Sequence, residues 1–249
     1  MTYFEGFIVP VPEANRDAFG KHAYQMAPLL KEIGVQRQVE AWGSDVPEGK
    51  VTDFRKAVAT KPDETVVFAW FEYPDRQARD DANQRMMSDP RMMEMGTDVP
   101  FDGKRMIMGG FEAVVEEGAS GGRYVDGIVV PVPTSKRDDY ARLAGENAKI
   151  FREHGATRVI ETLGDDVSHG QVTDFYRAVN AEEGETIAFS FIEWPDKASR
   201  DQAWQKIMQD NRMKHGGDLF DGKRMFWGGF DVIVDTAKSE QTAAIPVTA

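Results

Sequence analysis

Apolar residues recur along this chain with two spacings, one typical of strands and one typical of helices. The strand and helix segments follow the same order in the first and second halves of the chain. A two-residue period, or a nearly continuous apolar run, predicts first-half β-strands at residues 3–9, 35–43, 66–73 and 105–115. A spacing of three to four residues predicts two helices, one ending at Gly34 and one running from the N-cap Asp75 to about Ser88. The second half repeats this order, with strands expected at residues 124–130, 187–194 and 224–234.

Two local features refine these expectations. The string VTDFRKAV at residues 51–58 is expected to be extended. Proline cannot donate a hydrogen bond to a neighbouring strand, so the first strand of each half should stop at its prolines, Pro10 and Pro12 or Pro131 and Pro133.

The two halves are repeats of one unit. PFDGKRMIMGGF at residues 100–111 returns as LFDGKRMFWGGF at residues 219–230. Tyr3 aligns with Tyr124, and the alignment continues without a gap to Asp89 and Asp210. Two copies are too few for a solenoid and predict two domains of the same fold. The expected division is a first unit at 1–117, a flexible linker at 118–122, a second unit at 123–235 and a disordered tail at 236–249.

The order strand, helix, strand, strand, helix, strand predicts an α+β fold of two ferredoxin-like (βαββαβ) units. In such a unit, two helices cover one face of an antiparallel sheet. The strands here also carry apolar residues on the other face, which must therefore be covered. We expect the two sheets to pack against each other within the chain as a pseudo-dimer, a dimeric α+β barrel, with further self-association left open.

Both halves closely resemble the bacterial YbaA-like family, known as domain of unknown function 1428, in the dimeric α+β barrel superfamily. The matching first-half strings are YFEGFIVPVP, SDVPEGKVTDFRKAV, VVFAWFEYP, MMSDPRMM and PFDGKRMIMGGF, and each has a counterpart in the second half. The resemblance implies that ordinary members are single units that dimerise. It implies no activity, because the superfamily includes cofactor-independent monooxygenases, small isomerases and haem enzymes.

Charge and composition exclude several classes of function. The formal net charge is −12, and no basic run occurs, so binding to nucleic acid or to an anionic membrane surface is not expected. No apolar stretch is long enough to span a bilayer and no secretion leader is apparent, so a cytoplasmic location is expected.

The residue types that usually hold metals are poorly represented. The chain has no cysteine, which excludes thiolate metal sites, disulfides and thiol nucleophiles. None of its four histidines occupies the same position in both halves, which argues against a repeated metal or haem site. We therefore expect neither a metal nor a cofactor.

Carboxylates within apolar strands are the candidate catalytic groups. Such acids are Glu5, Glu40 and Glu72, answered in the second half by Asp126, Glu161 and Glu193. The catalytic candidates among them are Glu40 and Glu72, with their counterparts Glu161 and Glu193. Burial would raise the pKa of such a carboxyl and suit it to general acid or base catalysis. The alternative is that these residues lie at strand ends or pair with arginines across strands.

Two polar motifs could contact a ligand. Asp53 and Asp174 of the VTDF strings could orient a ligand hydroxyl or amine, or could satisfy local backbone donors. Arg105 and Arg224 of the FDGKR strings could bind an anion at the rim of a cavity, or could belong to a solvated turn. The glycine pairs 109–110 and 228–229, inside a strand pattern, indicate a bulge or a close backbone approach.

Large apolar residues could line an adaptable pocket. Trp70 and Met108, with their counterparts Phe191 and Trp227, differ between the halves in a way that a homodimer would not allow. Methionine suits adaptable binding surfaces, although ordinary core packing would also explain these residues.

Three functions remain open from the sequence. The first is a binder of a small, mostly apolar molecule in a cavity between sheet and helices. The second, by analogy with the superfamily, is a cofactor-independent monooxygenase or isomerase that uses a strand carboxylate. The third is a structural or protein-interaction module.

Overall fold

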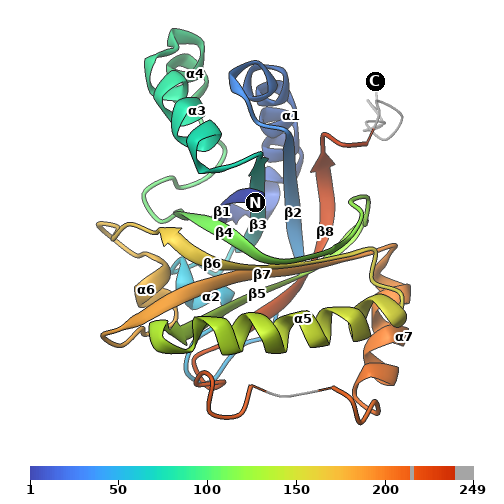
Figure 1. Ribbon diagram of the computed structural model, residues 1–249. Coiled ribbons are helices and arrows are strands. Elements are labelled where there is room, and N and C mark those ends of the chain that lie inside the picture. The colour runs from blue at the N-terminus through green and yellow to red at the C-terminus, as the bar shows by residue number, and fades with distance from the viewer. Residues whose placement is uncertain (214–215, 239–249) are drawn as a thin grey trace.

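The strands of the two halves form one closed barrel (Figure 1). The structure is a computed structural model that describes residues 1–213 and 216–238; the predicted tail lies outside the described residues from residue 239 onward. The first half contains β1 (Tyr3–Pro12), η1 (Glu13–Asn15), α1 (Arg16–Ile33), β2 (Arg37–Asp45), α2 (Phe54–Ala57), β3 (Glu64–Tyr73), α3 (Arg76–Ser88), α4 (Pro90–Met95) and β4 (Ile107–Gly118). The second half contains β5 (Tyr124–Pro133), η2 (Thr134–Lys136), α5 (Arg137–Glu153), β6 (Arg158–Asp166), α6 (Phe175–Ala178), β7 (Glu185–Trp194), α7 (Lys197–Ile207) and β8 (Phe226–Asp235).

The strand order around the barrel is β1-β3-β2-β8-β5-β7-β6-β4. Each half supplies the four antiparallel strands of a ferredoxin-like sheet, which confirms the predicted α+β class. The halves then join edge to edge, because β2 pairs with β8 and β4 pairs with β6. The predicted pseudo-dimer is therefore confirmed, with backbone hydrogen bonds that turn the two sheets into one continuous wall.

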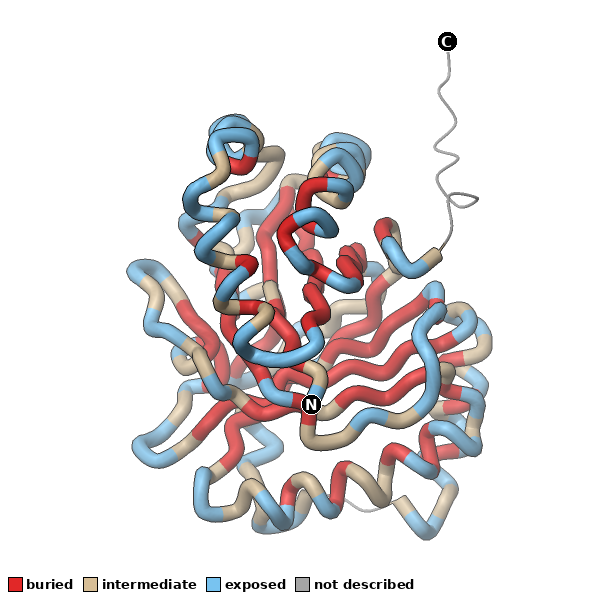
Figure 2. The backbone as a smooth tube through the Cα atoms, turned by 45° about the horizontal axis from the view of Figure 1, so that its top comes forward, coloured by how far each residue is buried: buried red, intermediate tan, exposed pale blue. Residues whose placement is uncertain are grey.

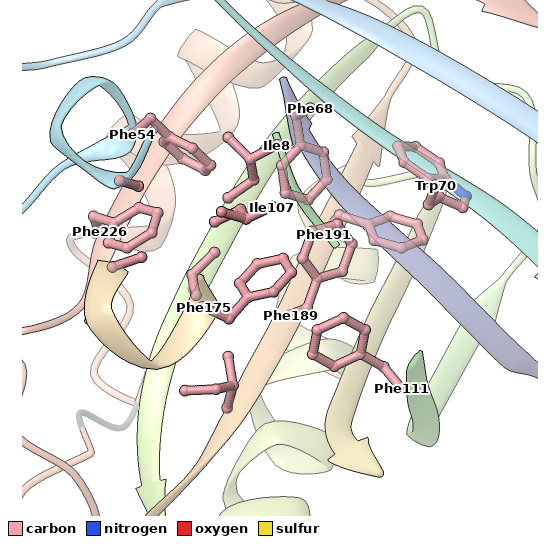
Figure 3. Packing of buried hydrophobic residues seen from close by; sticks show 14 of the residues in the cluster. Ile8, Phe54, Phe68, Trp70, Ile107, Phe111, Phe175, Phe189, Phe191 and Phe226 are labelled. Carbon is pink, nitrogen blue, oxygen red and sulfur yellow. The ribbon is translucent and has the colours of Figure 1, made fainter. Parts of the chain in front are cut away.

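The barrel interior is filled by side chains from both halves. Phe68 of β3 stacks on Phe189 of β7 with ring centroids 4.4 Å apart, and Phe111 of β4 lies 5.1 Å from Phe189. Figure 3 shows these rings with Phe54, Phe175, Phe226, Ile8 and Ile107 in one apolar cluster. The interior is a packed core, as expected for a small eight-stranded barrel.

The helices lie outside the barrel, with α1 and α3 on the first-half sheet and α5 and α7 on the second-half sheet (Figures 1 and 2). Their predicted boundary signals are confirmed. Asp75 accepts a hydrogen bond from the backbone N–H of Ala78 at 2.8 Å, which caps α3. Gly34 ends α1 with φ of 120°.

Two predictions about the backbone are wrong. β1 does not stop at Pro10, which pairs with Val66 of β3. On its other side β1 pairs with β4 only as far as Ile8, so the missing N–H of Pro10 leaves no partner unpaired. The segment expected to be extended forms the short helix α2, because the Asp53 side chain accepts a hydrogen bond from Lys56 N at 2.7 Å.

The connection between the halves is bound to the barrel. β4 continues to Gly118, and the N–H groups of Gly121 and Gly122 donate to Glu193 Oε2 at 3.0 and 3.1 Å. At the start of the predicted tail, Thr236 N donates to the carbonyl of Gln38 in β2 at 3.1 Å.

The paired glycines of the repeated motif allow a close approach, as predicted. A Cβ built on Gly110 would lie 2.3 Å from the Tyr3 hydroxyl and 2.7 Å from Arg79 Nη2. A Cβ on Gly229 would lie 2.3 Å from the equivalent hydroxyl of Tyr124. The second glycine of each pair therefore makes room for a tyrosine on the outer face of the barrel, and Gly110 also makes room for Arg79.

We predict that Gly110→Ala lowers the free energy of unfolding by about 1–3 kcal/mol, because the added methyl group overpacks a site filled by Tyr3. Gly20→Ala in α1 is the matched control, since a Cβ there meets nothing within 4 Å. That control should stabilise the helix by roughly 0.5–1 kcal/mol. Urea unfolding followed by circular dichroism measures both, and equal effects of the two substitutions would contradict the packing account.

Candidate functional site

Glu72 and Glu193 lie in a buried network of ion pairs at one end of the barrel. Arg37 of β2 donates to Glu193 Oε1 and Oε2 of the other half at 2.8 and 3.0 Å. It also donates to Glu72 at 3.0 Å and, through Nε, to Asp235 of β8 at 2.9 Å. The guanidinium thus bridges strands of both halves.

Arg158, the counterpart of Arg37, makes the reciprocal contacts. It donates to Glu72 Oε1 and Oε2 at 2.7 and 3.1 Å, and to Glu116 of β4 at 2.6 Å. Trp70 Nε1 also donates to Glu72, at 3.0 Å. Because Glu72 and Glu193 each accept hydrogen bonds from arginine of the other half, their geometry is that of structural ion pairs and not of a free general base.

The opposite end of the barrel is closed by the VTDF segments. Thr173 Oγ1 donates to the carbonyl of Ala57 at 2.7 Å, and Thr52 Oγ1 donates to the carbonyl of Ala178 in the reciprocal contact. Asp53 accepts hydrogen bonds from the N–H of Lys56 and of Gly49, at 2.7 and 3.0 Å. Asp174 caps α6 in the same way. Both aspartates therefore serve local backbone donors, which is the second alternative that the sequence offered.

The arginines of the FDGKR strings are fully engaged by protein groups. Arg105 donates to both oxygens of Glu64 at 2.7 Å and to the carbonyl of Ala59 at 2.8 Å. Arg224 binds Glu185 in the same bidentate way, at 2.7 and 2.8 Å. The pKa values of Glu64 and Glu185 are lowered by these guanidinium groups. In each half, the arginine of the FDGKR string thus attaches the loop before the last strand (β4 or β8) to the start of the third strand (β3 or β7).

The large apolar residues proposed to line a pocket are divided between the two faces of the barrel wall. Trp70 and Phe191 face the interior and stack on each other with centroids 4.0 Å apart. Met108 and Trp227 are on the outer face, 44% and 43% exposed. Only the latter pair can contact a molecule from solution.

The strand register aligns Glu40 with Met108 across the outer face of the first-half sheet. Glu40 of β2 pairs with Ala69 of β3, Ala69 with Phe7 of β1, and Phe7 with Met108 of β4. Since neighbouring strands are about 4.8 Å apart, the row spans roughly 14 Å. It places an acid, a small residue and two apolar side chains on the face that carries α1 and α3.

Glu40 is buried, and no cationic group among the described residues pairs with it. Its carboxyl accepts a hydrogen bond from Gln38 Nε2 at 3.0 Å, and the side chain is buried beneath α1. Burial raises the pKa of Glu40 to about 7, and the hydrogen bond from Gln38 only partly opposes this shift. Glu40 is thus a carboxyl that can gain or lose a proton at neutral pH.

Glu161, the counterpart of Glu40, has different partners. Tyr140 Oη and Ser190 Oγ donate to Glu161 Oε2 at 2.8 and 2.6 Å. Burial raises the pKa of Glu161, and the two hydroxyl groups act in the opposite direction. The two repeats therefore carry the same acid in two chemical environments.

Sequence reasoning missed the contribution of a tyrosine and an arginine at the paired glycines. Arg79 of α3 donates to the Tyr3 hydroxyl at 3.0 Å and to Asp166 of the second half at 2.6 Å. In the other half, Arg200 binds Asp126 at 2.8 Å and Asp45 of the first half at 3.2 Å. The repeat of both residues was the available signal: Tyr3 begins the YFEGFIVPVP string, whereas Arg79 lies outside the matching strings.

Other features of the surface are modest. A depression of about 360 Å³ beside α2 is lined by residues that include Val46, Asp53, Lys56 and Thr60, away from the row of Glu40. In the described part of the chain, no group of three or more His, Cys, Asp or Glu residues is arranged to hold a metal ion. None of the helices in residues 1–213 and 216–238 has the length and apolarity needed to cross a bilayer.

The fold defines a dimeric α+β barrel within one chain, and solved structures share it. A "Putative monooxygenase" from Fusobacterium nucleatum matches with a TM-score of 0.59 at 12% identity, covering 94% of this chain and 93% of that one. A "putative monooxygenase" from Lactobacillus acidophilus matches with a TM-score of 0.57 at 8% identity, covering 94% and 95%. An "anthrone oxidase-like protein" matches with a TM-score of 0.54 at 12% identity, covering 94% and 92%. At these identities the likeness concerns the fold alone.

The sequence then places the chain in a particular family. The family described as "Protein of unknown function (DUF1428)" matches residues 2–103 and 123–222, so the chain belongs to it, with two copies in tandem. "Uncharacterized protein YbaA" of Escherichia coli K12 is 58% identical over 117 residues, which is 47% of this chain and 100% of that relative. The protein of the same name from Shigella flexneri gives the same values. The family resemblance predicted from the motifs is confirmed.

We predict that Glu72→Ala lowers the free energy of unfolding by about 3–5 kcal/mol, because it leaves Arg158 buried without its bidentate partner. Adding Arg158→Met should recover part of that loss, and a double-mutant cycle from urea unfolding measures the coupling. The control Glu112→Ala, at an exposed position of β4, should change stability by no more than about 0.5 kcal/mol. Additive effects of Glu72→Ala and Arg158→Met would contradict the pairing.

Glu40 should make stability depend on pH with a defined sign. Its pKa is about 7 in the folded protein and near 4.5 in the unfolded chain, so the folded state binds the additional proton between these values. The free energy of unfolding should therefore fall as pH rises from 4.5 to 7, by about 3 kcal/mol in total. Glu40→Gln should remove this contribution and so reduce the pH slope, measured by urea unfolding at pH 5 and pH 8. The contributions of Glu5, Asp126 and Glu161, whose pKa values burial also raises, should remain in the variant. Parallel pH profiles for the wild type and the variant would show that Glu40 titrates normally.

Proposed function

We propose that the protein binds a small, mostly apolar molecule on the outer face of its first-half sheet and that Glu40 accepts a proton from it. The observation that carries this proposal is the environment of Glu40: a buried carboxyl beside apolar side chains, with a pKa of about 7 and no ion pair to any residue that the structure describes. A general base works best when its pKa lies near the working pH. The other three catalytic candidates are held by protein groups: Glu72 and Glu193 by arginines, and Glu161 by hydroxyl groups.

The surroundings of Glu40 suit an apolar ligand. Trp42 and Ala69, its neighbours on this face, pack with Phe19 of α1 in a buried cluster. Phe7, Phe101 and Met106 are only partly buried at the margin of that cluster. Methionine changes rotamer at low cost, so Met106 and Met108 could move to admit a ligand. We therefore propose the space between the first-half sheet and its helices as the binding site, in line with the expectation from the sequence.

The chemistry that follows is removal of an acidic proton from the ligand. The carboxylate of Glu40 takes the proton, and the electron pair remains on the ligand as an anion. Return of the proton to a second atom gives an isomerase. Oxidation of the anion by dioxygen, with one oxygen atom added to the ligand, the other released as water and the electrons supplied by the ligand, gives a monooxygenase. This activity rests on analogy with the fold of the two "putative monooxygenase" proteins.

The first experiment tests binding and proton removal separately. A panel of small, apolar compounds with an acidic C–H group is screened by thermal shift, and compounds that bind are incubated with the protein in deuterium oxide. Mass spectrometry then measures exchange of that hydrogen. We expect at least one compound to raise the melting temperature and to exchange faster with the wild-type protein than without it.

Two variants assign the role of Glu40 in that exchange. Glu40→Gln should slow it by about 10²–10⁴-fold, whereas Glu161→Gln should leave it nearly unchanged. Exchange that survives in Glu40→Gln would refute the role of Glu40. Binding without exchange would instead favour a non-catalytic small-molecule binder, and the absence of any thermal shift would favour the structural or protein-interaction alternative.

A further inference from the structure

The two repeats differ in the groups that surround their equivalent acids. Glu161 accepts hydrogen bonds from Tyr140 and Ser190. The aligned residues around Glu40 are Phe19 and Ala69, which carry no hydroxyl group. Both lie in the apolar cluster beside Glu40 and are 4% and 2% exposed. The first half therefore lacks the two donors that stabilise the ionised acid in the second half.

A single amide takes their place in the first half. Gln38, which aligns with Val159, donates from Nε2 to Glu40 Oε1 at 3.0 Å and to the carbonyl of Ala23 in α1 at 3.3 Å. Because both of these groups are hydrogen-bond acceptors, the side-chain amide of Gln38 is oriented with its nitrogen toward Glu40 and its oxygen away from it. Gln38 Oε1 is consequently buried with no donor, one of two such side-chain atoms in the described residues.

This arrangement has an energetic cost that ordinary packing would avoid. An unsatisfied buried acceptor costs about 1–3 kcal/mol, and Val159 shows that an apolar residue fits the equivalent position. Gln38 lowers the stability of the fold but orients the Glu40 carboxyl. Such a residue is expected where the orientation of a side chain matters more than stability.

Four titratable or charged groups on the elements next to Glu40 contact other residues. On α1, the His22 ring lies 6.4 Å from Phe101 and Arg16 lies over the Trp42 ring at 5.9 Å. Arg37 of β2 and Asp235 of β8 pair with each other inside the barrel. None of these groups forms an ion pair with Glu40 in the described part of the chain, so Gln38 is the main polar influence on it.

We propose that only the first half keeps a proton-accepting site, in which Gln38 is a positioning residue for Glu40, while Glu161 has become a structural hydrogen-bond acceptor. This inference rests on the proposed function of Glu40 and specifies it. One chain would then bind one ligand molecule. Fusion makes this division available, because each half can change independently, whereas a homodimer of identical units must keep two equal sites.

The test is an infrared pH titration of buried carboxyl groups in the full-length protein, which needs no ligand. Difference spectra against Glu40→Gln and against Glu161→Gln assign the two carboxyl signals. We expect Glu40 to titrate at a higher pH than Glu161. If Glu161 titrates at the same pH as Glu40 or at a higher one, the proposed division between the halves is wrong.

Exchanging residues between the repeats tests the cause. Gln38→Val, which introduces the second-half residue, should move the Glu40 midpoint to higher pH because the donor is lost, and should leave Glu161 unchanged. Ala69→Ser should move it to lower pH by supplying the hydroxyl found in the second half. Ser190→Ala is the reciprocal control and should raise the Glu161 midpoint alone.

Circular dichroism melting confirms that each variant is folded, so a structural loss is separated from a change in titration. An unchanged Glu40 midpoint in folded Gln38→Val would overturn the positioning role. Because this titration involves no ligand, its failure is distinguishable from a failure of the binding and exchange experiment.

Discussion

The structure depends on reciprocal contacts between the two halves, because neither half can close its sheet alone. Backbone pairing of β2 with β8 and of β4 with β6 removes the free edges. Arg37 and Arg158 then exchange carboxylate partners across one end of the barrel, and the threonines of the VTDF strings exchange carbonyl partners across the other. Each contact occurs twice because the two halves are related to each other by an approximate twofold axis. Closure of the barrel thus explains the repeat of the VTDF strings and of the strand arginines and glutamates.

Much of this fold could be predicted from the sequence, because many of its elements depend on interactions between residues that are close together in the chain. The Asp75 cap and the end of α1 at Gly34 are local signals, and both were correct. Strand periodicity gave the ferredoxin-like order. Features that depend on distant partners were not accessible: Pro10 continues a strand because β4 ends beside Ile8, and α2 is too short to show a helical period.

The candidate site shows the same limit. Glu40 could be singled out as an acid in an apolar strand, but so could Glu72, which lies between two arginines. Only the strand register and the side-chain partners separate them. Gln38 lies in no recognisable motif. The positioning role proposed for it rests on its hydrogen bond to Glu40 and on the valine at the equivalent position of the second half. Binding by Trp70 and Phe191 is disfavoured because both rings are buried within the barrel.

The place of β8 in the barrel has a consequence for synthesis of the protein. β8 ends at Asp235 and pairs with β2, which begins at Arg37, so the barrel wall cannot close until all of its strands have left the ribosome. Until then the nascent first half exposes unpaired strand edges, the feature through which newly made chains associate with one another. Chaperone dependence during translation would accordingly be concentrated in the interval between the emergence of β4 and the arrival of β8.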